Sequence, residues 1–222
     1  MKTIKTVKTC CALIGVATLL TASSALATVG TITLTYDYGN ANGGGAFTAV
    51  TTGGSNLGTF DTFCLAEGVL FHPGTTYNYT TSSSAIPGGP GNGGAADPIS
   101  IGTAYLYSQF RAGTLSGYTY GSPASANALQ TAIWWLEQEN FGYKNSFVTL
   151  VESVLGLDDT TVKGDANGQY GVFALNLTDA NGNYYQSQLG AVPEPSTVVA
   201  GALLLLPFGV STVRILRKNK LS

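Results

Sequence analysis

The stretch Leu129–Trp135 sets a glutamine among the large side chains of a compact apolar run, which also contains both tryptophans of the chain. At the spacing of an amphipathic helix, one face combines Ala126, Gln130, Ile133, Trp134 and Glu137. Gln130 therefore lies beside apolar bulk. An amide buried there must find hydrogen-bond partners, or it costs roughly 1–3 kcal/mol. The glutamine is thus either an ordinary hydrogen-bonded core residue or a group that is used chemically.

The N-terminus has the pattern of a secretory signal peptide over residues 1–27. Lys2, Lys5 and Lys8 precede an apolar run from Cys10 to Leu20, and small residues follow as far as Ala27. A basic segment, a short apolar segment and an Ala-x-Ala site are typical of a cleaved signal. The apolar run is too short to span a bilayer comfortably, so a permanent membrane anchor is disfavoured.

The C-terminal segment, residues 191–222, combines a Pro-Glu-Pro motif, an apolar stretch over about 197–213 and a basic end. The motif consists of Pro193, Glu194 and Pro195, and the basic residues are Arg214, Arg217, Lys218 and Lys220. The apolar stretch is barely long enough to cross a bilayer. Because basic flanks stay in the cytoplasm, the charges at both ends of the chain predict that residues 28–190 lie on the opposite, outer side of the membrane.

These three parts, in this order, resemble the PEP-CTERM sorting signal. The resemblance implies recognition by an exosortase-type processing enzyme and attachment to the membrane through the C-terminal helix before processing. It also implies cleavage near Pro193–Pro195 and export to the cell surface or extracellular matrix. That system is associated with Gram-negative, exopolysaccharide-producing bacteria. The signal is an address, and it leaves the activity of the exported domain open.

The exported part, residues 28–190, amounts to one domain and is acidic. It contains three of the ten basic residues, Arg111, Lys144 and Lys163, and all of the twelve acidic residues except Glu194. Three positive against eleven negative charges give a formal charge near −8. Such a charge argues against nucleic acid or an anionic membrane surface as a partner.

Cys64 is the lone cysteine of the exported domain, because Cys10 and Cys11 lie in the predicted signal peptide. It therefore has no intramolecular disulfide partner. In an exported protein, a lone cysteine suggests intermolecular pairing or a reactive thiol. The other common role of a free cysteine is that of a small buried hydrophobic residue.

The pattern of residues 28–190 predicts an α+β domain in which helices interrupt a mainly antiparallel β framework. Alternating or β-rich runs predict strands at Thr28–Tyr38, Ala46–Thr52, Leu57–Leu70, Thr75–Thr81, Tyr170–Leu177 and Asn183–Leu189. Start and stop signals predict helices from Asp97-Pro98 to Gly113, from Ser122-Pro123 to about Gln138, and from Asn145 to Gly156. Residues 39–45, rich in Gly and Asn, are expected to form a flexible turn. Cys64 is expected on a strand or at its end.

Two Asp-Ala-Asn-Gly sequences, at 165–168 and 179–182, begin in the way that calcium loops begin. In both, the glycine comes too early, and no bidentate glutamate follows at the required position. Asn-Gly is a common hairpin-turn pair, so both segments are predicted to be hairpin turns. No metal site and no other cofactor is expected.

Phe63-Cys64-Leu65 and the downstream Gln130-Thr131-Ala132-Ile133-Trp134 resemble the paired motifs of the thioester domains of bacterial surface adhesins. Those domains carry an aromatic-Cys-aliphatic motif ahead of a Gln-x-Ala-Ile-Trp motif. The resemblance implies an internal thioester between Cys64 and Gln130, with a pocket supported by Phe63, Leu65, Ala132, Ile133 and Trp134. It further implies covalent attachment to an amine-bearing surface or matrix target, with no turnover as an enzyme.

The chain departs from that family at Leu129, where threonine is usual, and at Leu65-Ala66, where Ile or Val followed by Asp is frequent. Neither change removes a reacting atom, but Ala66 leaves the role of that acid unfilled. Two alternatives stay open. A cysteine hydrolase would need His72, the single histidine, within hydrogen-bond reach of Cys64. A non-covalent structural or polysaccharide-binding matrix protein would keep Cys64 as a buried free thiol and stack sugars on some of its twelve tyrosines.

Overall fold

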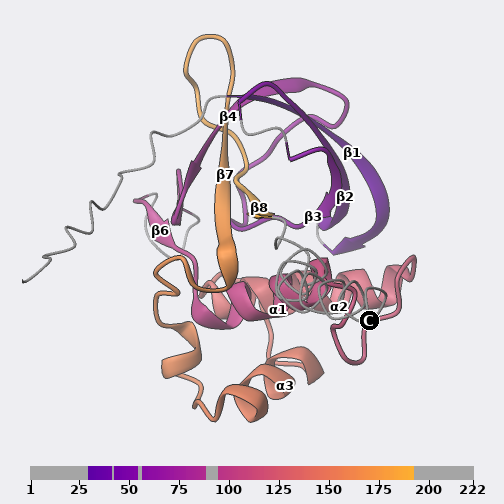
Figure 1. The fold of residues 1–222 in the computed structure, drawn as a ribbon, viewed down its shortest axis with the longest axis vertical. Helices are drawn as coiled ribbons and strands as arrows, with labels where there is room; N and C mark the ends of the chain where they lie inside the picture. The colour runs from indigo at the N-terminus through magenta and orange to yellow at the C-terminus, as the bar shows by residue number, and fades with distance from the viewer. Residues whose placement is uncertain (1–29, 42, 55–56, 89–94, 193–222) are drawn as a thin grey trace, which may run out of the picture.

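The computed structural model describes residues 30–41, 43–54, 57–88 and 95–192 (Figure 1). The predicted signal peptide, the Pro193–Pro195 motif and the apolar stretch at about 197–213 lie outside the described residues. Within the described part of the chain, no helix is both long enough and apolar enough to span a bilayer.

Six strands form one antiparallel sheet in the order β3-β2-β1-β4-β7-β8. Their bounds are β1 Gly30–Ala41, β2 Gly44–Thr52, β3 Thr59–Thr62, β4 Thr76–Ser82, β7 Val172–Thr178 and β8 Gln188–Ala191. A separate two-stranded ribbon pairs β5, Ser84–Ala85, with β6, Asp97–Pro98. In β1, Ile32 and Leu34 are fully buried and alternate with more exposed threonines, as a strand with one covered face requires.

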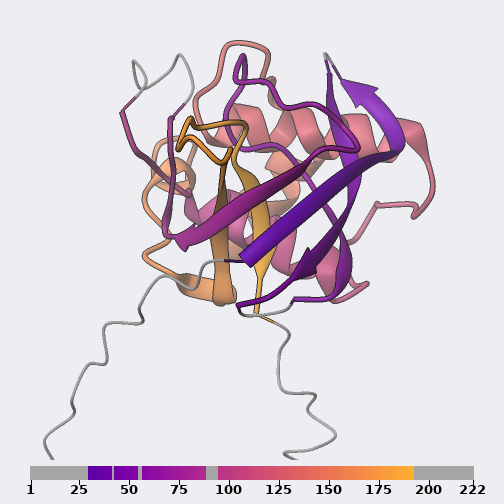
Figure 2. The ribbon, with the colours of Figure 1, turned by 90° about the horizontal axis from the view of Figure 1, so that it is seen from above.

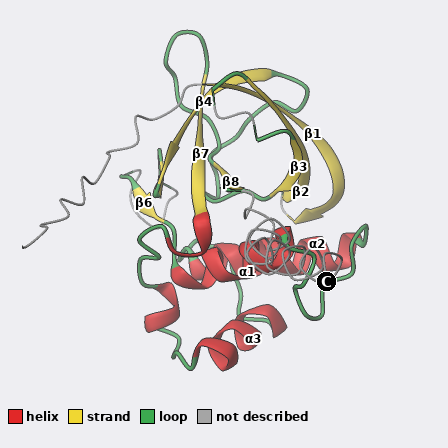
Figure 3. Ribbon diagram, in the orientation of Figure 1, coloured by secondary structure: helices red, strands yellow, loops and turns green. Residues whose placement is uncertain are grey.

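The sheet curls until its two edges meet, so that it forms a closed sheet (Figures 1 and 3). Just after β3, the carbonyl of Phe63 accepts a hydrogen bond from the N–H of Leu189 at 3.0 Å. Two residues later, the N–H of Leu65 donates to the carbonyl of Ser187, also at 3.0 Å. These bonds form a seam between the segment after β3 and the β8 end of the chain.

Three helices cover one end of the closed sheet. They are α1 Ile101–Arg111, α2 Pro123–Leu136 and α3 Ser146–Leu155, and two short 3-10 helices follow at Thr161–Lys163 and Gln169–Gly171. Seen from above in Figure 2, the strands lie in front of the helices. Helices α1 and α2 lie next to the sheet, whereas α3 lies beyond them (Figure 1). Side chains of Ser100, Ser122 and Asn145 cap the three helices by accepting backbone N–H bonds.

The buried apolar residues form two clusters. The strand cluster lies within the closed sheet and comprises Ile32, Leu34, Phe47, Ala49, Phe60, Cys64, Tyr77, Tyr79, Trp134, Leu175 and Leu177. The larger helix cluster lies between the sheet and the helices, and it includes Phe63, Leu65, Leu129, Ala132 and Ile133. The second helix therefore contributes to both clusters, because Trp134 reaches into the strand cluster while Ile133 packs among the helices.

The α+β class, with a mainly antiparallel sheet and three helices, is confirmed by the described residues. The starts of α2 and α3 are also as predicted, with caps at Ser122 and Asn145. The predicted start of the first helix is wrong. Asp97 and Pro98 pair with β5 instead, and Ser100 is the cap because its hydroxyl reaches the N–H of Thr103 at 3.1 Å.

Four other predictions of local structure are wrong. Strand β3 ends at Thr62, and the chain then forms a loop in which Gly68 and Gly74 adopt positive φ. The last strand was predicted at Asn183–Leu189, but it comprises only β8, Gln188–Ala191. Most of the predicted range lies between the turn at 179–182 and this strand. Residues 165–168 are not a hairpin turn, since they lead into the 3-10 helix Gln169–Gly171 and Asp165 bridges to Ser100. The run 39–45 is not simply a turn, because β1 extends to Ala41 and β2 begins at Gly44.

Candidate functional site

Cys64 lies at the seam, directly after β3, where it forms an isolated antiparallel bridge with Gln188. Its neighbours Phe63 and Leu65 make the two seam hydrogen bonds to the β8 side. In an antiparallel pair, successive residues direct their N–H and C=O groups to opposite sides. The peptide groups of Cys64 therefore point away from β8, where no further strand continues the sheet.

The side-chain amide of Gln130 occupies that position. Its Oε1 accepts a hydrogen bond from the N–H of Cys64 at 3.0 Å, and its Nε2 donates to the carbonyl of Cys64 at 2.9 Å. Gln130 is fully buried on α2, so both bonds are shielded from water. The structure thus brings together Cys64 and Gln130, which are far apart in the sequence, with the amide lying along the main chain of the cysteine.

A second main-chain donor reaches the same oxygen. The N–H of Gly45 on β2 donates to Gln130 Oε1 at 3.2 Å. The side-chain carbonyl oxygen of Gln130 therefore accepts hydrogen bonds from two N–H groups, those of Cys64 and Gly45. Two backbone donors on one carbonyl oxygen are the arrangement that stabilises charge developing on that oxygen during acyl transfer.

Glycine is needed at two adjacent positions of β2 for this contact. A Cβ on Gly44 would lie 2.7 Å from Trp134 and 2.9 Å from Gln130, closer than carbon atoms approach without a shift. Gly45 has a φ of +137°, which residues with a side chain rarely adopt. The absence of side chains allows Gln130 and Trp134, one turn apart on α2, to approach the backbone of β2.

The sulfur of Cys64 has a different partner. Nε2 of Gln188 lies 3.5 Å from Sγ, and both residues are buried. Burial is the main cause that raises the pKa of the Cys64 thiol to about 12, and the hydrogen bond from Gln188 acts in the opposite direction. The thiol is therefore protonated at neutral pH, which suppresses its general reactivity.

A cavity of about 110 Å³ adjoins Cys64. Its lining includes Cys64, Trp134, Gly44, Tyr36, Leu70 and Phe71. Tyr36 and Leu70 are largely exposed, so the cavity leads from the surface to the cysteine. One water needs roughly 10–15 Å³ by this measure, which means that the cavity accommodates a small molecule. No lining residue is charged.

Loop residues 65–75 form one wall of the cavity and are anchored at several points. Oε2 of Glu67 accepts a hydrogen bond from the N–H of Phe141 at 2.6 Å. The ring of Phe71 packs edge-on against Phe47, with 4.9 Å between the ring centres. The N–H of Gly74 donates to the carbonyl of Leu34 at 2.7 Å. The wall beside Cys64 is therefore fixed to both the sheet and the helical side.

The five residues expected to support a pocket divide between the two clusters. Only Trp134 lines the cavity beside Cys64. The others, Phe63, Leu65, Ala132 and Ile133, are buried in the helix cluster. They therefore lie behind the seam and contribute by fixing the positions of Cys64 and Gln130 rather than by facing the cavity.

His72 and the turn at 179–182 do not contribute to this site. The side chain of His72 is exposed, and within the described part of the chain the hydrogen-bond partner of Cys64 Sγ is Gln188, not His72. Asp179 binds the N–H and side chain of Asn183 within its own turn. In residues 30–41, 43–54, 57–88 and 95–192, no group of three or more His, Cys, Asp or Glu side chains could hold a metal ion.

Three contributors to the site were not recognised in the sequence: Gly44, Gly45 and Gln188. The glycines gave a signal, because a Gly-Gly-Gly run marks either a flexible turn or a close backbone approach. Gln188 gave none, since a polar residue beside Leu189 fits an ordinary alternating strand. Comparison of the chain with protein-family models, with curated proteins and with solved structures gives no match.

Proposed function

We propose that this exported cell-surface or matrix protein forms an internal thioester between Cys64 and Gln130 and uses it to attach covalently to amines on a partner. The observation that carries the proposal is the position of the Gln130 amide. It lies along the main chain of Cys64, with two N–H groups on its carbonyl oxygen. Each molecule reacts once, so the protein is an adhesin-like reagent rather than an enzyme, and it needs no cofactor.

In the forming step, Sγ of Cys64 attacks Cδ of Gln130, and negative charge develops on Oε1. The N–H groups of Cys64 and Gly45 stabilise that charge. The C–N bond then breaks, and Nε2 leaves as ammonia, which takes the proton of the thiol. The hydrogen bonds between the Gln130 amide and the main chain of Cys64 support this step, because they hold the amide at the residue that carries the thiol. Fixing two reacting groups in this way can supply an effective molarity on the order of 10⁵ M.

In the attachment step, a primary amine of the partner attacks the same carbon. The C–S bond breaks, and a new amide joins the partner to the former Gln130. The proton lost by the amine goes to the sulfur, so Cys64 is released as a thiol. The cavity beside Cys64 provides a route for the amine, and apolar walls such as Trp134 limit the water that would hydrolyse the bond.

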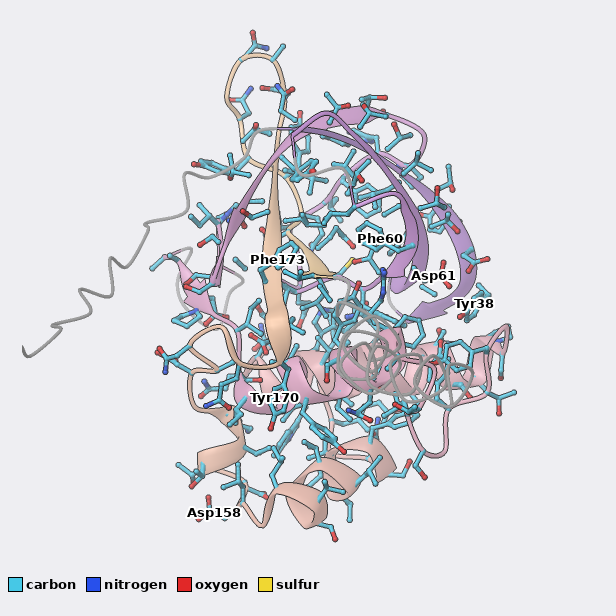
Figure 4. All side chains as sticks on the ribbon, in the orientation of Figure 1. Tyr38, Phe60, Asp61, Asp158, Tyr170 and Phe173 are labelled. Atoms are coloured by element: carbon cyan, nitrogen blue, oxygen red, sulfur yellow. The ribbon has the colours of Figure 1, made fainter. Side chains whose placement is uncertain are left out.

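The lysines of the described domain are engaged elsewhere. Lys144 pairs with Glu152 at 2.8 Å and also with Asp159. Nζ of Lys163 lies 3.5 Å from the centre of the Trp135 ring, which packs against the helix cluster. In Figure 4, Asp158, next to the Lys144 partner, lies on the α3 side of the molecule, away from the closed sheet. This placement favours reaction with an external amine over reaction within the chain.

The sorting signal supplies the second half of the proposal, and its support is the sequence alone. An exosortase-type enzyme cleaves near Pro193–Pro195, after the stretch at about 197–213 has held the protein in the membrane. The basic end of the chain stays on the cytoplasmic side. The domain is then delivered to the surface or the exopolysaccharide matrix of a Gram-negative bacterium. Replacing Pro193 and Pro195 by alanine should leave the protein in the membrane fraction, and normal release of the variant would contradict this route.

The test of the thioester is the intact mass of the purified protein. We expect a mass lower than that of the unmodified chain by one ammonia, and a gain of one methylamine after treatment with that amine. Both signals should vanish in Cys64→Ala and in Gln130→Ala. Peptide mapping of the methylamine product should place the label on residue 130.

One alternative has a specific observation in its favour. The amide of Gln130 has three main-chain partners, which is also what a purely structural glutamine needs. In that case the protein is a non-covalent structural or polysaccharide-binding matrix protein with a buried free cysteine. An unmodified intact mass, together with one thiol that titrates after denaturation, is the result that this alternative predicts.

A further inference from the structure

Gln188 has a buried amide whose described contact is the sulfur of Cys64. The residue is fully buried at the start of β8, opposite Leu175 on β7 and Cys64 across the seam. Its Nε2 lies 3.5 Å from Sγ, whereas its Oε1 is buried without a hydrogen-bond partner. Leaving a buried acceptor unpaired is unfavourable. Among the described residues, the contact with the sulfur is the hydrogen bond that accounts for the orientation of this amide.

The N–H of Gln188 faces the sulfur, so this amide acts on Cys64 as a hydrogen-bond donor. A neutral thiol sulfur accepts a hydrogen bond only weakly, whereas a sulfur that carries negative charge accepts one strongly. The amide is therefore placed to favour a sulfur on which charge develops. The acyl oxygen and the sulfur thus have separate donors. Oε1 of Gln130 accepts hydrogen bonds from the N–H groups of Cys64 and Gly45, whereas the sulfur faces the N–H of Gln188.

We propose that Gln188 is the hydrogen-bond donor for the sulfur of Cys64 when an amine opens the thioester, a role that rests on the proposed function. As the amine attacks Cδ of residue 130, the C–S bond breaks and its electron pair moves to Sγ. The N–H of Gln188 stabilises the departing sulfur without giving up its proton. The proton of the amine then reaches Sγ, so the products are an amide and a thiol.

This role makes Gln188 a determinant of how fast the bond reacts. Cys64 belongs to an apolar cluster that offers little stabilisation to a departing thiolate, and the described donor beside the sulfur is the Gln188 amide. Hydrogen bonds to charged groups are worth about 1.5–3 kcal/mol. Loss of the donor should therefore slow opening by roughly ten- to a hundred-fold.

The experiment compares the purified full chain with Gln188→Leu and Gln188→Glu. The leucine removes both polar groups, whereas the glutamate keeps the shape but offers no N–H. For each protein, the rate of opening by methylamine is followed by the gain in mass and the release of one thiol. We expect both variants to form the thioester and to open it more slowly, with the glutamate variant slowing further as the pH rises and the carboxyl ionises.

A second measurement does not depend on the thioester. In a Gln130→Ala background, Cys64 is a free thiol, and its pKa can be followed by the ultraviolet absorbance of the thiolate. Adding Gln188→Leu should raise that pKa, because the donor that favours the ionised sulfur is lost. This comparison separates a donor to the sulfur from a residue that merely fills space.

Asn176 supplies the matched control. It is a buried amide on the neighbouring strand β7, but it binds Ile86, Ser84 and Ser187 rather than sulfur. Asn176→Leu should lower thermal stability and leave the opening rate unchanged. An unmodified mass in the wild type would overturn the proposed function and this role with it. A wild-type thioester that opens equally fast in folded Gln188→Leu and Gln188→Glu would overturn only the role of Gln188. Mapping of the acyl group to Gln188 itself would overturn both this role and the proposed bond between Cys64 and Gln130.

Discussion

The amide of Gln130 lies along the main chain of Cys64, accepting its N–H at 3.0 Å and donating to its C=O at 2.9 Å. A side chain of a helix thereby replaces the strand that would otherwise continue the sheet beyond Cys64. The third bond, from Gly45, ties β2 to the same amide at 3.2 Å. One glutamine amide thus joins α2, β2 and the seam.

The first prediction concerns the stability that these hydrogen bonds supply. In a Cys64→Ala background, which cannot form a thioester, Gln130→Leu should lower the free energy of unfolding by on the order of 3 kcal/mol or more. The reason is that three buried main-chain groups, on residue 64 and Gly45, lose their partner, at about 1–3 kcal/mol each. Urea unfolding at fixed pH measures the difference.

The matched control is Gln109→Leu on α1. The amide of Gln109 accepts a bond from the Thr114 hydroxyl near the surface, so its loss should cost well under 1 kcal/mol. Equal effects of the two substitutions would show that the bonds of Gln130 contribute little.

The second prediction concerns the close approach of α2 to β2. Gly44→Ala should destabilise the protein by about 1–3 kcal/mol, because the new Cβ would lie within 3 Å of Trp134 and Gln130. It should also reduce the fraction of molecules that lack one ammonia, since the amide is displaced from the Cys64 and Gly45 donors. Thermal unfolding and intact mass, measured on the same preparation, test both effects.

Gly164→Ala is the control for this substitution. Gly164 has a φ of −70°, and its nearest neighbour to a new Cβ is a carbonyl oxygen at 3.2 Å. Gly164→Ala should destabilise the protein much less than Gly44→Ala does, and it should leave the intact mass otherwise unchanged. If Gly44→Ala were as stable as the wild type and still lost one ammonia completely, a close approach of α2 to β2 would not be required.

Local signals in the sequence predicted the helices, but not the geometry of the site. Ser122-Pro123 and Asn145 marked two helix starts correctly, because capping depends on a few neighbouring residues. The pairing of Cys64 with Gln130 was suggested by a resemblance of short motifs, and spacing alone could not have supplied it. The donor Gly45 comes from β2, which pairs directly with β3, whereas Gln188 comes from β8, which reaches Cys64 only through the closure of the sheet. Such contacts depend on strand register, which is a property of the whole sheet.

The third prediction concerns the reactivity of the thiol when no thioester can form. In Gln130→Glu, Cys64 should be alkylated by iodoacetamide at pH 8 roughly a thousand-fold more slowly than in the unfolded chain. Burial raises its pKa from 9.0 to about 12, so little thiolate is present, and only 4% of the residue is exposed. Mass spectrometry over time, with and without denaturant, measures the two rates. Fast labelling of the folded variant would show that the sulfur is not held in the strand cluster.

The last prediction concerns a buried carboxyl at the other end of α2. Burial, its largest cause, raises the pKa of Glu137 from 4.5 to about 7, although Ser100 donates both its N–H and its hydroxyl to Oε1. The folded protein therefore binds this proton more tightly than the unfolded chain does. The resulting stabilisation is complete below about pH 4.5 and is lost as the pH rises through 7, with a total on the order of 3 kcal/mol. Asp97 acts in the same direction, because burial and Asp165 raise its pKa to about 6.

Glu137→Gln should flatten the decline of the unfolding free energy between pH 4.5 and 7, because an amide keeps the hydrogen bonds without a titrating group. Asp158→Asn is the control. Backbone N–H bonds from the Thr160–Thr161 turn lower the pKa of Asp158 below 3.8, so it titrates outside this interval and its loss should not change the slope. Urea unfolding at a series of pH values provides the comparison. If Glu137→Gln kept the full slope, the proton would belong to another group, and the α1–α2 junction would have to be stabilised by the charged form of Glu137.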